Sequence, residues 1–210
     1  NDDVGNWKTG NPGICFVTRG PGATNASIAI HTARQDSTPL IVFVGQVGRD
    51  ATSREAWQEI DYRMMFGHIA KWVDQIETAD RIPEYVNRAY HVATSGRPGP
   101  VVLALPEDVL TDLATVADCP AFRRSHSAPS PQGIAEMIAA LGEAKRPLMI
   151  VGGGGWTREA TDGIAGFAEA FDLPVACSFR RQDLVDNANE RYSGEAGLGM
   201  DANLAARIKE

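Results

Sequence analysis

Short apolar runs alternate along this chain with longer segments in which apolar residues recur at helical spacing. In the first half, residues 14–17 and 40–44 are almost entirely apolar, which is typical of strands buried on both faces of a sheet. Between them, the residues that recur at the spacing of one helix face are Ala26, Ala29, Ile30 and Ala33. We expect a glycine-proline-glycine turn at residues 20–22 to connect the first strand to this short helix.

The rest of the first half repeats this order. Residues 48–63 are polar and of mixed charge, and we expect a long loop there, with or without a short helix. Residues 71–76 predict a strand, and the segment that starts at Arg81 predicts a helix, with Gly96 just after its end. Residues 101–106 predict another buried strand. Strand, helix and strand in this order predict a parallel sheet with right-handed crossovers.

A second α/β segment follows a change in composition. Residues 118–130 are rich in proline, serine and arginine and predict a linker. At its end, Ser130 and Pro131 are typical of the first residues of a helix. Strand, glycine-turn, helix and strand patterns follow, and they predict a βαβ unit at the start of a Rossmann-like domain. We therefore expect an α/β fold with two domains, at residues 1–117 and 131–210.

Composition excludes several classes of function. The formal net charge of −7 argues against a surface for nucleic acid or an anionic membrane, because both favour clustered lysine and arginine. The three cysteines lie far apart without a CxxC motif, so we expect no disulfide framework, no zinc site and a reducing cytosol. No HxH or HExxH spacing occurs, and we predict no metal site. We also expect neither a signal peptide nor a membrane span, which needs about 18 consecutive apolar residues.

Two glycine-rich turns are candidates for ligand contact. A glycine turn at the end of a buried parallel strand serves either tight packing or the approach of a ligand at the carboxyl edge of the sheet. The four glycines at residues 152–155 begin a GxGxx pattern, but Thr157 stands where a dinucleotide-binding motif has its third glycine. The pattern alone leaves packing and binding open for both turns.

Four motifs in a fixed order carry a resemblance to a known family. They are GPGATN at residues 20–25, EAWQEID at 55–61, SGRPGP at 95–100 and RPLMIVGGGG at 146–155. With their surroundings, they resemble the acetohydroxyacid synthase (acetolactate synthase) branch of the thiamine-diphosphate enzymes from residue 11 to residue 210. The resemblance implies the C-terminal part of a pyrimidine-binding domain, the linker, and the N-terminal part of a Rossmann-like central domain.

The resemblance also implies where the chain sits in a longer polypeptide. In the family, the glutamate that activates the cofactor precedes the equivalent of Pro12, and the GDG…N motif that holds Mg²⁺ and the diphosphate lies in a third domain. This sequence contains neither. We therefore expect a middle segment of a polypeptide more than twice as long, and we expect these 210 residues alone to be inactive.

Site residues are implied by the same resemblance. The loop beside the aminopyrimidine ring matches Gly20, Pro21, Gly22 and Asn25, although Asn25 could instead be a plain N-cap. Trp57 and Gln58 match the catalytic cleft. There the Gln58 amide would hydrogen-bond oxygens of the substrate or intermediate, while Trp57 could equally be a packing residue.

A second set of residues matches positions that contact FAD in the flavin-binding members: Arg97, Gly152, Gly153 and Gly154. Flavin binders carry a small, glycine-bearing turn after the next strand, whereas this chain has the bulky, charged Arg180 and Arg181. These arginines would either pair with a diphosphate or fill the flavin groove, which leaves FAD doubtful.

The function implied is decarboxylation of a 2-oxoacid and carboligation, with thiamine diphosphate and Mg²⁺, as in branched-chain amino-acid biosynthesis. We expect a cytoplasmic homodimer or homotetramer with a small-molecule substrate. Two alternatives stay open. One is another thiamine-diphosphate enzyme, of the oxalyl-CoA, sulfoacetaldehyde or benzoylformate type, and the other is a non-catalytic nucleotide- or flavin-binding module.

Overall fold

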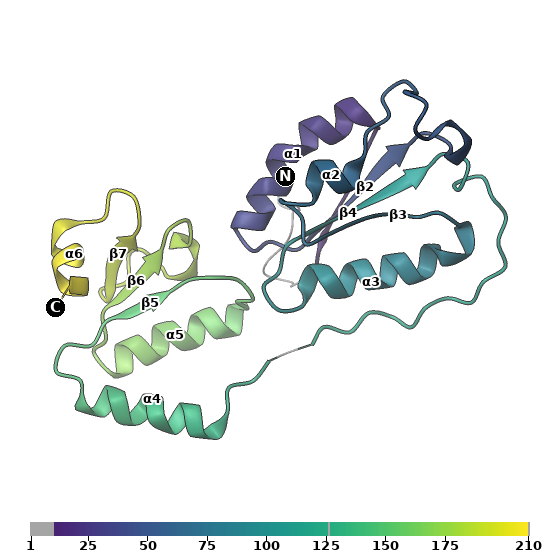
Figure 1. Ribbon diagram of the computed structural model, residues 1–210. Helices are drawn as coiled ribbons and strands as arrows, with labels where there is room; N and C mark the ends of the chain where they lie inside the picture. Colours follow the sequence, from purple (N-terminus) through teal and green to yellow (C-terminus); the bar gives the residue numbers. More distant parts are fainter. Residues whose placement is uncertain (1–10, 126, 210) are drawn as a thin grey trace. The chain divides into compact units, whose positions relative to one another are not determined.

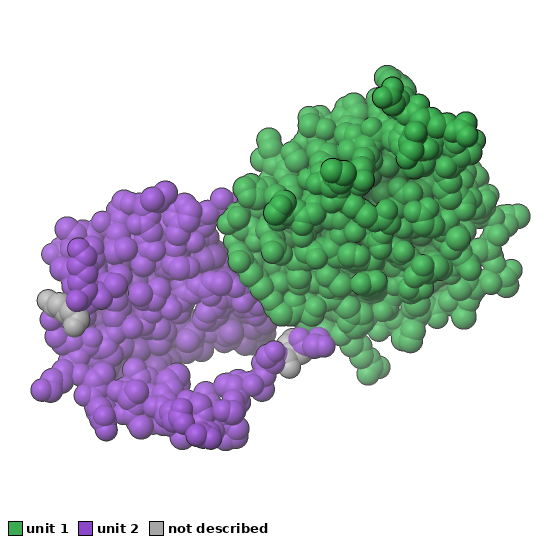
Figure 2. Space-filling view, viewed as in Figure 1, with its two compact units in different colours: residues 1–124 green, residues 125–210 purple. Residues whose placement is uncertain are grey.

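The computed structural model describes residues 11–125 and 127–209, which form two α/β units (Figure 1). The units comprise residues 1–124 and 125–210 and are coloured separately in Figure 2. The first ten residues of the predicted first domain, and His126 in the predicted linker, lie outside the described residues. Within the described part of the chain, every helix is too short or too polar to cross a bilayer.

The first unit is built on a parallel sheet of four strands in the order β1-β2-β4-β3. The strands are β1 (Gly13–Val17), β2 (Leu40–Gln46), β3 (Trp72–Gln75) and β4 (Pro100–Pro106). The helices are α1 (Gly20–Gln35), α2 (Tyr62–Phe66) and α3 (Ile82–Thr94), with short 3₁₀ turns at Arg49–Ala51 and Ala79–Arg81. The predicted parallel arrangement is confirmed.

Alternate residues of the central strands pack into two separate hydrophobic cores, one on each face of the sheet. Leu40, Val42 and Val44 of β2 pack with α1 and α2 on one face of the sheet. Ile41 and Phe43 pack with α3 on the other face. This alternation follows from the two-residue period of a strand, and it explains why β2 and β4 read as continuous apolar runs.

Strand β1 departs from the prediction that it is buried on both faces. It is an edge strand in the described sheet, and Ile14 and Phe16 are 45% and 70% exposed. Both side chains lie on the α3 side of the sheet, where Phe16 stacks on Phe43 with 4.7 Å between ring centroids. Helix α3 packs against β2 and β4, so the outer part of this face stays uncovered within the described chain.

The start of α1 also differs from the prediction. Gly20 is the first residue of the helix and Pro21 occupies its first turn, so residues 20–22 form helix rather than a separate turn. Proline suits this position because its missing N–H would have no helical partner there. Asn25 lies inside the helix, and the N-cap position belongs to Arg19, so the N-cap interpretation of Asn25 is wrong.

The buried face of α1 is shifted from the predicted one. Ala29, expected on that face, is exposed, while Ala23 is fully buried. Ile30 and Ala33 are buried as predicted. At the end of α3, Gly96 has a φ of +56°, the left-handed conformation expected of a glycine after a helix.

The second unit contains a parallel sheet in the order β5-β6-β7. Its strands are β5 (Met149–Val151), β6 (Val175–Ser178) and β7 (Tyr192–Ala196). Its helices are α4 (Pro131–Glu143), α5 (Arg158–Ala170) and α6 (Ala202–Lys209), and a 3₁₀ turn lies at Gln182–Leu184. Ser130 caps α4 as predicted, since its side chain accepts a hydrogen bond from the Gly133 N–H.

Strand β7 and helix α6 have no counterpart in the sequence prediction. The β7 sequence YSGEA has no apolar run, and pairing with β6 defines the strand instead. Helix α4 is rich in apolar residues, but none of its residues is buried, and Met137 and Ile138 are 47% and 60% exposed.

Candidate functional site

The carboxyl edge of the first sheet brings together two of the predicted motifs. The Gly20 N–H, at the start of α1, donates to the Gln58 carbonyl at 3.1 Å. Two residues further on, the Ile60 carbonyl accepts a 2.9 Å hydrogen bond from Nε2 of Gln46, a buried residue at the end of β2. The loop that carries Trp57 and Gln58 is therefore fixed against the first turn of α1.

Both glycines of the GPG sequence are required by contacts within the chain. A Cβ on Gly20 would lie 3.0 Å from the Gln58 carbonyl oxygen and 3.4 Å from Cδ1 of Ile60. A Cβ on Gly22 would lie 2.8 Å from Cγ2 of Thr18, the residue directly after β1. Tight packing therefore accounts for these glycines without any ligand.

The loop between β2 and α2 has an unusual backbone. Ser53, Glu55 and Gln58 all have positive φ, at 63°, 54° and 69°, although none is glycine. Such conformations are sparsely populated and cluster at functional sites. Gln58 is half-buried, and Trp57 is 82% exposed, which excludes a core packing role for Trp57 within the described residues.

The other two predicted residues of the GPGATN motif lie on the surface of α1. Pro21 and Asn25 are exposed in the first two turns of the helix. An exposed amide and a rigid ring are free to meet a ligand or another chain. Their contact with a cofactor stays a prediction.

A pocket of ≈ 210 Å³ opens beside the Gln58 loop. Polar side chains from three segments line it, among them Gln46, Glu59 and Asp74. Tyr62 also lines it and donates its hydroxyl to the Gly45 carbonyl at 3.2 Å. Burial raises the pKa of Tyr62 to about 12, while the charge of Arg19 acts in the opposite direction. The phenol therefore stays a neutral donor throughout the physiological range.

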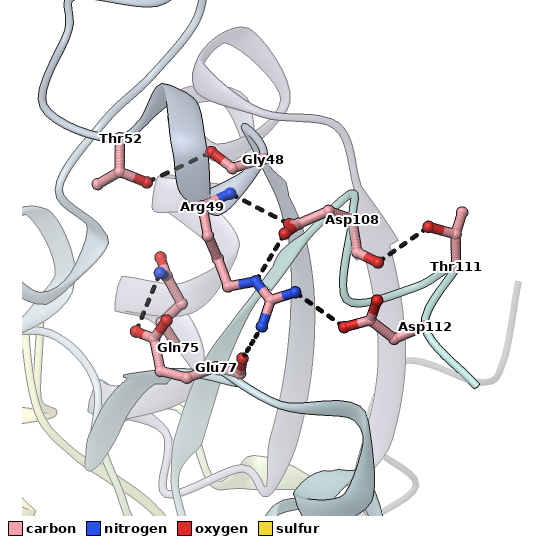
Figure 3. A network of polar contacts seen from close by, with 8 residues as sticks. All are labelled: Gly48, Arg49, Thr52, Gln75, Glu77, Asp108, Thr111 and Asp112. Atoms are coloured by element: carbon pink, nitrogen blue, oxygen red, sulfur yellow. Dashed lines mark hydrogen bonds and ion pairs between the residues drawn. The ribbon is translucent and has the colours of Figure 1, made fainter. Parts of the chain in front are cut away.

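Arg49 ties together three loops at the same edge of the sheet (Figure 3). Its Nε and Nη2 donate to the carboxylates of Asp108 and Asp112, at 2.6 and 2.8 Å, in the loop after β4. Its Nη1 donates at 2.8 Å to the Glu77 carbonyl after β3. Because Arg49 itself follows β2, its side chain connects the segments that follow β2, β3 and β4.

This network predicts an acid-dependent loss of stability. Hydrogen bonds from Arg49 lower the pKa of Asp108 below its usual value of 3.8. Between the lowered pKa of Asp108 in the folded protein and its usual value in the unfolded chain, the unfolded chain binds more protons than the folded one. The stabilisation that the Arg49–Asp108 pair gives the fold is therefore full above pH 3.8 and is lost as pH falls below it. Asp108→Asn should lower the free energy of unfolding at neutral pH, with a deficit that shrinks below that pH.

Urea unfolding across this pH range measures the effect. Asp118→Asn, which changes an exposed carboxylate in the same unit, is the matched control and should show no such convergence with the unsubstituted protein. A deficit for Asp108→Asn that stays constant into acid would contradict the role of the Arg49 pair.

Arg97 lies at the opposite, amino edge of the first sheet, just before β4. Its guanidinium donates to the carbonyls of Arg34 and Gln35 and to the Ser37 hydroxyl, at 3.2, 2.9 and 2.8 Å. These contacts cap the C-terminal end of α1. The structure therefore does not bring Arg97 together with Gly20 and Gln58.

The glycines after β5 form the predicted turn. Gly152 is close-packed, since an added Cβ would lie 2.1 Å from the Ser178 Oγ at the end of β6. Gly153 has a φ of +73°, and Gly153 and Gly154 are exposed. The Gly152 carbonyl accepts from the Trp156 indole N–H at 2.9 Å.

The charged turn after β6 is held by a carboxylate of the protein itself. Glu195 of β7 accepts from the backbone N–H of Arg180 at 3.1 Å and also from the Gln182 side chain. Arg180 has a φ of +63°, and the largely buried Arg181 side chain lies 3.7 Å from the Asp183 carboxylate. Because the negatively charged Glu195 side chain already binds this turn, the turn is a poor fit to a flavin diphosphate, which is also negatively charged.

The described part of the chain has free cysteines, and its possible metal-ligand side chains are dispersed. Within residues 11–125 and 127–209, no three His, Cys, Asp or Glu side chains gather so as to hold a metal ion. Cys15, Cys119 and Cys177 are free thiols, and burial raises the pKa of Cys177.

Sequence reasoning missed several residues that build this edge. Arg49 and Asp108 were indistinguishable from surface charges, because their partners are remote in sequence. Gln46 offered a signal, since an amide that ends an apolar strand and becomes buried needs specific partners.

Two sequence models of one enzyme family match the chain. The model described as thiamine pyrophosphate enzyme, N-terminal TPP binding domain, matches residues 5–65. The model described as thiamine pyrophosphate enzyme, central domain, matches residues 134–210. Together the two matches take in more than half of the chain.

Curated relatives support the same assignment. The chain is 37% identical over 205 residues to the acetolactate synthase large subunit of Lactococcus lactis. It is 38% identical over 197 residues to the acetolactate synthase isozyme 3 large subunit of Escherichia coli. These matches cover 94% and 90% of this chain but 36% and 34% of the relatives. The chain thus spans about a third of the length of the curated relatives it matches.

A solved structure shares the fold. It is the thiamine diphosphate-dependent 4-hydroxybenzoylformate decarboxylase of Rhodococcus jostii, with a TM-score of 0.69 and 24% identity. The likeness covers 84% of this chain and 34% of that one. With both family models matched in order along its two α/β units, the chain belongs to the thiamine pyrophosphate enzymes.

Proposed function

We propose that this chain is part of an acetolactate synthase-like enzyme, which decarboxylates a 2-oxoacid and joins the remaining carbons to an acceptor with thiamine diphosphate. The observation that carries the proposal is the contact between the Gly20 N–H and the Gln58 carbonyl. It places the start of α1 and the Gln58 loop at one sheet edge, inside the region matched by the thiamine pyrophosphate-binding model. Relatives named acetolactate synthase favour this reaction and a role in branched-chain amino-acid biosynthesis.

Thiamine diphosphate supplies the carbanion-stabilising chemistry when bound, and the protein supplies binding and orientation. We propose that Gly20, Pro21, Gly22 and Asn25 lie beside the aminopyrimidine ring of the cofactor and that the Gln58 amide hydrogen-bonds substrate oxygens. We propose that Trp57, exposed beside Gln58, also lies at the catalytic cleft.

In keeping with the resemblance, we propose that the diphosphate and Mg²⁺ are held by another domain of the complete polypeptide. Flavin is not part of the proposal. The carboxylate of Glu195 binds the turn at Arg180, where flavin binders carry a small, glycine-bearing turn. Arg97, one of the four residues that match flavin contacts, instead caps the C-terminal end of α1.

We further propose a cytoplasmic homodimer or homotetramer with no nucleic-acid or membrane partner. Free thiols favour a reducing compartment. The uncovered apolar side chains of β1 and α4 favour burial against other polypeptide.

Assay of the complete polypeptide with pyruvate and other 2-oxoacids tests the function. We expect carbon dioxide release and acetolactate formation only when thiamine diphosphate and Mg²⁺ are present. The Gln58→Ala protein should be about 10²-fold slower, in line with the loss of one positioned transition-state donor. Turnover without thiamine diphosphate would refute the proposal. Decarboxylation of benzoylformate without carboligation would favour the alternative suggested by the Rhodococcus structure.

A further inference from the structure

We propose that Glu59 is a positioning residue, which holds the loop of residues 53–58 in the shape that presents Gln58 to the substrate. The inference rests on the proposed function, because it assigns a role toward the same site. Its basis is a carboxylate that binds the backbone of the loop at two points.

Both oxygens of the Glu59 carboxylate accept backbone hydrogen bonds. The Ser53 N–H donates to Oε1 at 2.6 Å, and the Ala56 N–H donates to Oε2 at 3.2 Å. The Glu59 N–H in turn donates to the Ala56 carbonyl at 3.0 Å. Hydrogen bonds to an ionised acceptor are stronger than neutral ones, so this half-buried side chain closes the loop on itself.

The loop needs such a closure because its backbone is strained. The positive φ angles at Ser53, Glu55 and Gln58 persist only where the surroundings enforce them. The far end of the loop is fixed by the Gly20 N–H on Gln58 and by Gln46 on Ile60. Glu59 fixes its interior, so the direction of the Gln58 side chain depends on both sets of contacts.

Without the Glu59 carboxylate, the loop would keep its hydrogen bonds to Gly20 and Gln46, but its interior would no longer be held in one conformation. Misplacement of a catalytic group by about 1 Å can lower turnover about 10²-fold. We therefore expect Glu59→Ala to lower kcat/KM about 10- to 100-fold, because the proposed hydrogen bond from the Gln58 amide to substrate oxygens depends on the shape of this loop. Glu59→Gln, which keeps one acceptor oxygen, should be intermediate.

A double-mutant cycle in the complete protein distinguishes positioning from general damage. If Glu59 acts through Gln58, the double variant Glu59→Ala/Gln58→Ala should be no slower than Gln58→Ala alone. Glu55→Gln, which removes a carboxylate from the same loop without touching the two Glu59 hydrogen bonds, is the matched control and should keep wild-type turnover.

Hydrogen exchange of peptides spanning residues 49–60 supplies a readout independent of activity. Glu59→Ala should speed exchange at Ser53 and Ala56, and Glu55→Gln should not. Unchanged exchange in Glu59→Ala, or additive losses in the double-mutant cycle, would overturn the proposal. An unsubstituted protein without thiamine-dependent turnover would instead refute the proposed function, and exchange would still decide whether Glu59 orders the loop.

Discussion

The Gly20→Val protein is expected to fold but to turn over about 100-fold more slowly than the unsubstituted enzyme, because displacing a catalytic group by about 1 Å costs this much. A Cβ at this position already lies 3.0 Å from the Gln58 carbonyl oxygen, and the two valine methyl groups reach further. The obstacle is backbone rather than a flexible side chain, so the loop itself must retreat. Its hydrogen bond to the Gly20 N–H then lengthens, and Gln58 moves with it.

Steady-state kinetics of the complete protein with a 2-oxoacid measure this loss, and circular dichroism confirms folding. Gly163→Ala is the control, since a Cβ there meets nothing within 4 Å and alanine favours the helix by about 1 kcal/mol. That variant should keep full turnover. Wild-type kcat in Gly20→Val would mean that the contact between α1 and the Gln58 loop does not position the site.

The central strands could be predicted from sequence because burial on both faces is visible in the apolar composition of each strand. Strands β2 and β4 are covered on both faces, so nearly every residue is apolar. Strand β1 has a similar composition but lies at an edge, and its exposure depends on which elements cover Ile14 and Phe16. Strand β7 was missed because its sequence has no apolar run, and its pairing with β6 defines it as a strand.

The site was predictable only in part for a similar physical reason. The motifs around Gly20 and Gln58 could each be found in the sequence, and the resemblance assigned the first to the aminopyrimidine ring and the second to the catalytic cleft. What joins them is a backbone hydrogen bond between residues far apart in the chain, which no periodicity reveals. The Arg49 network and the Glu59 carboxylate depend equally on side-chain directions set by the folded loops.

The largest effect on stability is expected from Gly152→Ala in the second unit. Gly152 directly follows β5, and its added Cβ would lie 2.1 Å from Oγ and 2.8 Å from Cβ of Ser178 at the end of β6. Rotation of the serine side chain relieves the first contact but not the second. The paired strands must therefore separate, and overpacking of this kind costs about 1–3 kcal/mol of unfolding free energy.

A series of second substitutions separates the two contacts. Ser178→Ala removes only Oγ and should restore part of the stability lost in Gly152→Ala. Ser178→Gly removes Oγ and Cβ and should restore more, less the cost of about 0.5–1 kcal/mol for a glycine in a strand. Gly166→Ala, in open space on α5, is the control and should not destabilise the unit. Hydrogen exchange of peptides from β5 and β6 measures each variant. Equal protection in Gly152→Ala and the unsubstituted protein would show that the turn accepts a side chain, which would contradict a packing role for this glycine.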